Sequence, residues 1–181
     1  MYLRSVFQSS TGLALAPNGT VYAYQPAEFI KFMAKYGEDQ KTVAAALANV
    51  KPLNGPMVGL DLPDNVDAVI TVQNYHDMHL KPFPVDTAAK ANAEIFKSLK
   101  PGGVFLVIDH AATAGSGVTA ADGLHRIDIA AVKSEVEAAG FKLEAESPLL
   151  ANKADPHTAS VFDPSIRGKT DQFILKFRKP K

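Results

Sequence analysis

The sequence predicts an α/β fold, a mostly parallel, doubly wound sheet that closes with an antiparallel hairpin. Three observations support this fold class. Residues 104–108 read Val-Phe-Leu-Val-Ile, an unbroken apolar run typical of a strand covered on both faces. Helical and strand-like segments alternate along the chain. Residues 141–146 and 173–177 alternate apolar and polar side chains, as strands with one wet face do.

The first part of the chain predicts a strand followed by two helices. Residues 20–24, Thr-Val-Tyr-Ala-Tyr, follow the turn residues Pro-Asn-Gly and indicate a short strand. Residues 27–36 and 38–50 are helical in pattern, the second strongly so because of its alanines. A further short strand fits between these helices and the β-branched segment 66–72, which predicts the next strand.

The middle of the chain predicts a βαβ unit. Residues 86–99 predict a helix, because their apolar side chains fall on one helical stripe and Asp86 is a candidate N-terminal cap. Residues 100–103, Lys-Pro-Gly-Gly, are expected to end this helix. The apolar strand follows at once, so the unit that starts at residue 66 should cross over right-handedly.

The last part of the chain predicts one more helix and the closing hairpin. Asp128 is expected to cap a helix that Gly140 ends in a left-handed conformation. The two alternating strands flank the long segment 148–170 and are expected to pair antiparallel at one edge of the sheet.

Composition limits the classes of function. The 181 residues fit one compact domain over 1–181, with 46% hydrophobic and 21% charged residues, which excludes wholesale disorder and a coiled coil. Nineteen basic and nineteen acidic residues balance, so we expect no nucleic-acid or membrane partner, and the basic tail 176–181 is expected to be a solvated terminus. The absence of cysteine excludes disulfides and thiolate sites. As written, the chain is expected to be cytoplasmic, with an exported longer precursor left open.

Several short motifs occur along the chain in a recognisable order. They are Leu99-Lys100-Pro101-Gly102-Gly103, Asn74-Tyr75-His76-Asp77, Asp109-His110-Ala111-Ala112, His125-Arg126-Ile127-Asp128, Phe162-Asp163-Pro164 and residues 166–173. Together with the order of elements they resemble the class I S-adenosylmethionine-dependent methyltransferases. Within that class they resemble a bacterial family of predicted methyltransferases, over nearly the whole chain and most strongly from Asn74 onward.

This resemblance implies a Rossmann-like methyltransferase fold with the first strand missing. The opening segment resembles the family's first helix and second strand, so the first strand and its glycine-rich cofactor turn have no counterpart. Gly115-Ser116-Gly117 is the one Gly-x-Gly and is expected to be a flexible loop near the site. Without the central strand, two strands would have exposed edges or pair directly, which predicts a homodimer or a rearranged sheet.

Polar residues follow two strands that should be neighbours, at the edge where open α/β sheets bind ligands. Asn74, Tyr75 and His76 follow the strand at 66–72, and Asp109 and His110 end the next. His76 is a candidate general base or acceptor-positioning group, the alternative being a loop histidine bonded to backbone. Asp109 is expected to orient His76 or His110, unless it only caps a turn.

Further candidates lie outside these two strand ends. His125 could face the same cleft, with Arg126 binding a substrate carboxylate in bidentate fashion. Arg167 is expected to close the cleft with Lys169 and Asp171, the alternative being a surface pair of Arg167 with Asp163 or Asp171. Gln25 follows the strand at 20–24, where the resemblance places a ribose-binding acidic residue. His79 and His157 are expected at the surface.

The resemblance implies methyl transfer from S-adenosylmethionine to a small molecule, mainly by alignment of donor and acceptor, with base help from His76 or His110. In that interpretation Gln25, Asn74 and Tyr75 bind the cofactor, and His76, Asp109, His110 and His125 are catalytic. A second hypothesis is a non-catalytic relic of the fold that self-associates and binds another ligand or partner. A third is a metal-assisted hydrolase using the His/Asp cluster, although no tight histidine spacing supports it and no metal ligand is assigned.

Overall fold

A computed structural model describes residues 19–181, whose strands form two separate sheets. The chain divides into two compact units, Met1–Met57 and Val58–Lys181, each of which is described by itself. The family-like first helix expected in the opening segment lies outside the described residues, as do Pro17 and Asn18 of the predicted turn. A single domain over 1–181 stays a prediction.

The first unit contains β1 (Val21–Pro26), α2 (Ala27–Phe32), α3 (Lys35–Ala46) and β2 (Val50–Gly55). The two strands are parallel, with Val21 opposite Val50. From α3, the buried Gln40 side chain donates hydrogen bonds to the carbonyls of Ala23 and Leu53, one on each strand, and so ties the helix to the pair. The helix predicted over 38–50 was too long, because its last residue is buried as the first residue of β2.

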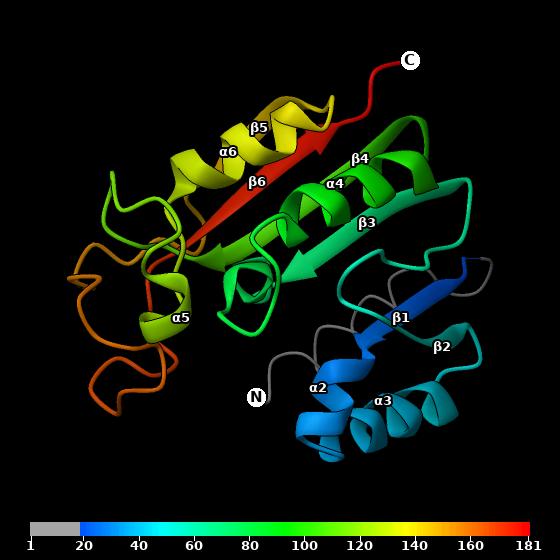
Figure 1. The fold of residues 1–181 in the computed structure, drawn as a ribbon, viewed down its shortest axis with the longest axis horizontal. Helices are drawn as coiled ribbons and strands as arrows, with labels where there is room; N and C mark the ends of the chain where they lie inside the picture. Colours follow the sequence, from blue (N-terminus) through cyan, green and yellow to red (C-terminus); the bar gives the residue numbers. More distant parts are fainter. Residues whose placement is uncertain (1–18) are drawn as a thin grey trace. The chain divides into compact units, whose positions relative to one another are not determined.

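The second unit is a four-stranded sheet of order β3-β4-β6-β5 with two helices, α4 and α6, on one face (Figure 1). β3 and β4 are parallel, and β6 runs antiparallel to both of its neighbours. The predicted terminal hairpin is confirmed, with β5 at the edge. The elements are β3 (Val66–Val72), the short 3₁₀-helix η1 (His76–His79), α4 (Thr87–Ser98), β4 (Leu99–His110), α5 (Ala121–Leu124), α6 (Ile129–Ala138), β5 (Lys142–Ser147) and β6 (Gln172–Arg178).

The Lys-Pro-Gly-Gly segment is part of a strand, whereas the sequence predicted a turn. β4 begins at Leu99, and Val66 pairs with Leu99 while Ala68 already pairs with Val104. The extra residues of β4 bulge out of the ladder, which Gly102 permits by adopting a φ of 79°. Leu99 therefore starts a strand and does not end the helix, which explains why the predicted helical stripe was one residue too long.

Aromatic side chains build the core of the second unit. Phe141 packs against Phe96 and Phe105 at ring-centroid distances of 4.9 and 5.5 Å, and Phe105 lies 6.4 Å from Phe177. Gly140 ends the preceding helical segment at a φ of 102°, as predicted. A side chain there would also meet the Phe96 ring at 3.1 Å, so the close approach requires glycine as well.

The two predicted helix caps have different outcomes. Asp128 accepts a hydrogen bond from the backbone N–H of Ala130 and caps α6, as expected. Asp86 stands before α4 without a side-chain cap bond, and its carboxylate pairs with Lys90 instead, at 2.8 Å.

In the described part of the chain the strands with only one neighbour are β1 and β2 in the first sheet and β3 and β5 in the second. β1 pairs with β2 alone, and β3 pairs with β4 alone. The homodimer and the direct strand pairing expected from a missing strand stay predictions. None of the helices in this range is long and apolar enough to cross a membrane.

Candidate functional site

Asp109, the penultimate residue of β4, is the centre of the site. It is fully buried, and its carboxylate accepts hydrogen bonds from the backbone N–H groups of His76 and His110 at 2.8 and 2.7 Å. Its Oδ1 also lies 2.8 Å from Nδ1 of His76. Burial alone would raise the pKa of Asp109, but the charge and hydrogen bonds of His76 outweigh it and hold the pKa below its ordinary value. Asp109 is therefore an anion held against His76.

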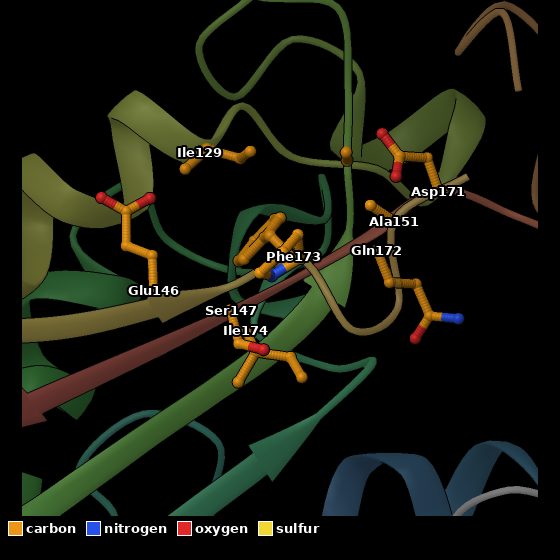
Figure 2. Close-up of a pocket in the computed structure, with 10 residues that line it drawn as sticks. Ile129, Glu146, Ser147, Ala151, Asp171, Gln172, Phe173 and Ile174 are labelled. Atoms are coloured by element: carbon orange, nitrogen blue, oxygen red, sulfur yellow. The ribbon is translucent and has the colours of Figure 1, made fainter. Parts of the chain in front are cut away.

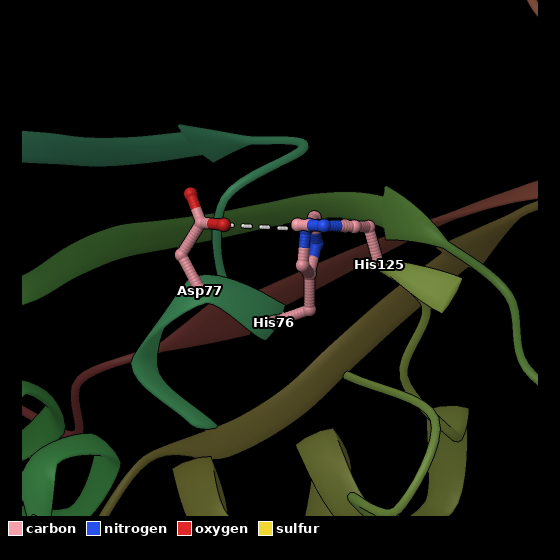
Figure 3. Close-up of side chains that lie close together, drawn as sticks. All are labelled: His76, Asp77 and His125. Atoms are coloured by element: carbon pink, nitrogen blue, oxygen red, sulfur yellow. Dashed lines mark ion pairs between the residues drawn. The ribbon is translucent and has the colours of Figure 1, made fainter. Parts of the chain in front are cut away.

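The hydrogen bond that His76 donates to Asp109 fixes the tautomer of the neutral imidazole. An ionised carboxylate only accepts hydrogen bonds, so Nδ1 carries the hydrogen and Nε2 is left facing away from Asp109. Nε2 lies 3.3 Å from Oδ1 of Asp77, and the imidazole of His125 stands edge-on to His76 at a centroid distance of 5.3 Å. Figure 3 shows these three side chains converging. Asp77 was not among the site residues predicted from the sequence, and the 3₁₀ turn of η1 places its carboxylate beside the ring of His76, the preceding residue.

His125 is placed by the end of α5. It adopts a left-handed backbone conformation, with φ 53° and ψ 47°, which turns the chain out of the helix. The ring is half-buried and packs against Phe162 at a centroid distance of 4.8 Å. Burial lowers the pKa of His125, and the nearby His76 adds to this shift.

His110 lies beside His76 and Asp109, but its ring is hydrogen-bonded to a different residue. Its Nδ1 is 2.8 Å from the hydroxyl of Thr170, and its ring centroid is 6.1 Å from that of His76. Burial lowers the pKa of His110 to about 4, against which the charge of Asp109 acts only in part. The structure thus brings the four side chains predicted to be catalytic into one cluster, in which His110 is neutral at neutral pH.

Arg126 does not face a cleft. Its guanidinium is fully buried and forms a bidentate pair with Asp155, at 2.8 and 3.1 Å. The remaining hydrogen bonds go to the carbonyls of Ala111 and Ala159. The predicted bidentate carboxylate therefore exists but belongs to the chain itself, and Arg126 has no exposed surface to offer a substrate.

Arg167 lies exposed on the long segment before β6. It forms no ion pair with Asp163 or Asp171 in the described part of the chain. Asp171 pairs instead with His157 at 2.9 Å, so this histidine is half-buried and bonded, where the sequence suggested a surface residue.

The side chains of Asn74 and Tyr75 serve the fold. The Oδ1 of Asn74 accepts hydrogen bonds from the hydroxyl of Thr71 and the N–H of Val72, which closes the end of β3. Tyr75 is fully buried, and its hydroxyl donates to Glu135 and accepts from Asn92, so it reaches no open surface. Burial, and then the charge of Glu135, raise the pKa of Tyr75.

Glu135 has a second partner in His79, whose Nε2 lies 3.1 Å from Oε2 of the same carboxylate. The side chain of His79 is only 9% exposed, so the prediction of a surface histidine was wrong here. Glu135 thereby links α6 to the segment around η1 through two side chains, those of Tyr75 and His79.

Replacing Tyr75 by phenylalanine tests this network. Tyr75→Phe keeps the ring but leaves the buried Nδ2 of Asn92 without its partner, so we expect a loss of about 1–3 kcal/mol in the free energy of unfolding, measured in urea. Tyr22→Phe, at a tyrosine that is 40% exposed, is the matched control and should change little. Equal stability of the two variants would contradict a role for the Tyr75 hydroxyl.

Gln25 lies in the first unit, near the carboxyl end of β1. It is 6% exposed, and its Nε2 has no hydrogen-bond partner within residues 19–181. A buried amide donor without a partner is costly, and a ligand hydroxyl or carboxylate would satisfy it. The position predicted to hold a ribose therefore carries an available donor.

A hollow of about 270 Å³ lies elsewhere in the second unit, beside the ends of β5 and β6. Figure 2 shows Phe173 in it, with Glu146 and Asp171 at its rim. None of the histidines of the cluster lines this hollow. The Asp171 carboxylate is already bonded to His157 and to the N–H of Asn152. The hollow and the histidine cluster are therefore separate features.

Comparison with solved structures places the fold. A protein from Nostoc punctiforme with a predicted O-methyltransferase activity matches with a TM-score of 0.65 at 15% identity, over 97% of this chain and 48% of that one. A SAM-dependent methyltransferase from Aquifex aeolicus matches with a TM-score of 0.62 at 16% identity, over 97% and 77%. The [4+2]-cyclase SpnF matches with a TM-score of 0.61 at 17% identity, over 97% and 81%.

The chain spans about half the length of the Nostoc protein. No protein-family model matches the sequence, and a search of curated proteins finds no match either. The narrower likeness to one bacterial family stays a prediction. A methyltransferase and a cyclase both match, so the structural similarity establishes the fold but not the reaction. The reaction has to be inferred from the residues of the site. The chain has the Rossmann-like fold of the class I SAM-dependent methyltransferases.

Proposed function

We propose that the chain transfers a methyl group from S-adenosylmethionine to a small molecule, with His76 and Asp109 activating the acceptor. The observation that supports this most directly is the fixed orientation of His76: Nδ1 lies 2.8 Å from the Asp109 carboxylate, so Nε2 is the nitrogen that takes up or releases a proton. The pair stands where β3 and β4 end. Open α/β sheets bind ligands at this carboxyl edge.

Methyl transfer requires the residues of the site to align donor and acceptor and to accept one proton. S-adenosylmethionine supplies a methyl group on a positively charged sulfur. The acceptor atom bonds to the methyl carbon while the carbon–sulfur bond breaks with its electrons on sulfur, so alignment dominates the rate. His76 accepts the proton that the acceptor loses, and the buried anion of Asp109 stabilises the imidazolium that results.

Gln25 supports the cofactor side of the proposal. Its buried, unpartnered amide donor suits a ribose hydroxyl or a carboxylate, the groups that the cofactor would present. Gly115-Ser116-Gly117 lies between β4 and α5, but the N–H groups of both glycines donate to the carboxylate of Asp128, so this loop does not offer them to a cofactor. Each unit supports the proposal by itself: the first contains Gln25 as a candidate donor to the nucleoside, and the second contains His76 as a candidate base for the acceptor.

Calorimetry tests cofactor binding. We expect S-adenosylmethionine and S-adenosylhomocysteine to bind with micromolar dissociation constants, and Gln25→Met to weaken both by about 10-fold, the equivalent of one hydrogen bond. His76→Gln should keep cofactor binding. With a radiolabelled methyl group and a panel of phenols, carboxylates, amines and thiols, His76→Gln should lose transfer by about 100-fold or more. No heat at millimolar cofactor would contradict the proposal.

The second candidate is a self-associating relic that binds another ligand. The observation that favours it is the unpaired edge of β1 and of β3 within residues 19–181, since such edges invite pairing with another chain. Light scattering over a range of concentrations would then reveal a dimer, together with silence in the cofactor calorimetry. A monomer that binds S-adenosylmethionine would reject this candidate.

A further inference from the structure

We propose that His76, Asp77 and His125 form a binding site for a divalent transition-metal ion. One ligand atom of each side chain lies within 4.8 Å of the other two. The three residues come from segments far apart in the sequence, η1 and the end of α5. In Figure 3 their side chains point toward one another.

The spacing suits coordination. Two ligand atoms at about 2.1 Å from a tetrahedral ion lie about 3.4 Å apart. Nε2 of His76 and Oδ1 of Asp77 are separated by 3.3 Å, so these two ligands already have the required distance. A ring nitrogen of His125 lies within 4.8 Å of both ligand atoms, so coordination requires it to move closer by at most about 1.4 Å.

The charges call for a cation at this point. The carboxylates of Asp109 and Asp77 lie at the two ring nitrogens of His76, Asp109 at Nδ1 and Asp77 at Nε2. A positive charge between His76 and Asp77 is therefore favoured, either as a proton on Nε2 or as a metal ion that replaces this proton. Asp109 also has the place of the outer carboxylate that orients a metal-binding histidine and makes it a better ligand.

The donor set selects the kind of ion. Two imidazoles and one carboxylate suit zinc, iron(II), cobalt(II) or nickel(II), whereas calcium and magnesium prefer oxygen ligands alone. Three protein ligands leave at least one position for water or a substrate, as in catalytic sites. Phe162, 53% exposed, packs against the ring of His125 and adds an apolar side chain next to this ligand.

The site itself stands without the proposed methyl transfer, but its role in acceptor activation rests on that function. An ion and a proton compete for Nε2 of His76. In the ion-free protein His76 takes the acceptor's proton, whereas an ion held by His76, Asp77 and His125 would occupy Nε2 and would supply Lewis-acid assistance to the acceptor instead. Metal affinity should therefore fall as the pH is lowered.

The test is titration of the full chain, freed of metal by a chelator and then exchanged into buffer, with zinc and with cobalt(II). We expect one ion per chain, and for cobalt a visible absorption band typical of a low-coordinate site. His125→Gln and Asp77→Asn should each weaken binding by at least about 100-fold, and Asp109→Asn by about 10- to 100-fold. His157→Gln removes a histidine outside the cluster and should change nothing.

Two results would overturn the site: no binding up to millimolar metal, or unchanged affinity in His125→Gln. A urea unfolding curve for each variant separates lost ligands from lost folding. Calorimetry with S-adenosylmethionine in the presence of chelator keeps the two proposals apart. Cofactor binding without metal binding removes only the metal site, and metal binding without cofactor binding removes only the methyltransferase.

Discussion

Asp155→Ala is expected to reduce the free energy of unfolding by about 3–5 kcal/mol, because it leaves the charge of Arg126 buried without a partner. Both side chains of the pair are fully buried, and two hydrogen bonds of 2.8 and 3.1 Å join them. The carboxylate also accepts hydrogen bonds from the N–H groups of His157 and Asp171. Removing it therefore loosens the long segment before β6 as well as the guanidinium.

A double variant separates the ion pair from the other bonds. Arg126→Met with Asp155→Ala removes both charges, so it should be less destabilised than the sum of the single variants. Asp163→Ala is the matched control, because this exposed carboxylate bonds only within its own turn, to Ser165. It should shift stability by less than about 0.5 kcal/mol. Urea unfolding measures all four proteins, and a loss below about 1 kcal/mol for Asp155→Ala would contradict a structural role for the pair.

Local patterns predicted the elements of this fold well. The apolar run at 104–108, the β-branched segment 66–72 and the alternating strands all form where the sequence places them, because burial on one or two faces imposes these patterns directly. The boundaries of the helices and strands were harder to predict, because they depend on which strands pair. Lys-Pro-Gly-Gly has turn chemistry, but Leu99 pairs with Val66, and the partner strand holds the segment in the sheet.

The site was predictable only in part. His76 and Asp109 follow neighbouring parallel strands, and parallel strands end at the same edge, so their meeting follows from topology. Asp155 and Glu135 were not predicted, since they meet Arg126 and Tyr75 across 29 and 60 residues of chain. Nothing local marks such a partner. The sequence showed that Arg126 needs a carboxylate but not that the chain supplies one itself.

Lowering the pH from 7 to 4.5 should cost about 2–3 kcal/mol of stability through His110 alone. Its pKa is about 4 in the folded chain and about 6.5 when unfolded, so between these values the unfolded chain binds a proton that the folded chain does not. Stability is therefore lost as the pH falls through this window and is unaffected above it. His125, whose pKa is also lowered by burial, acts in the same direction.

His110→Asn isolates the contribution, because asparagine is neutral throughout and can still bond to the hydroxyl of Thr170. The fall in unfolding free energy from pH 7 to pH 4.5 should be smaller in the variant by about 2 kcal/mol. The lowered pKa values of Asp109 and Asp155 act mainly below pH 4, outside the range measured. Proton NMR of the imidazole provides a direct check, since His110 should remain neutral down to about pH 4. A histidine titrating near pH 6.5 at this position would mean that it is solvated, and the cluster around Asp109 would then be open to water.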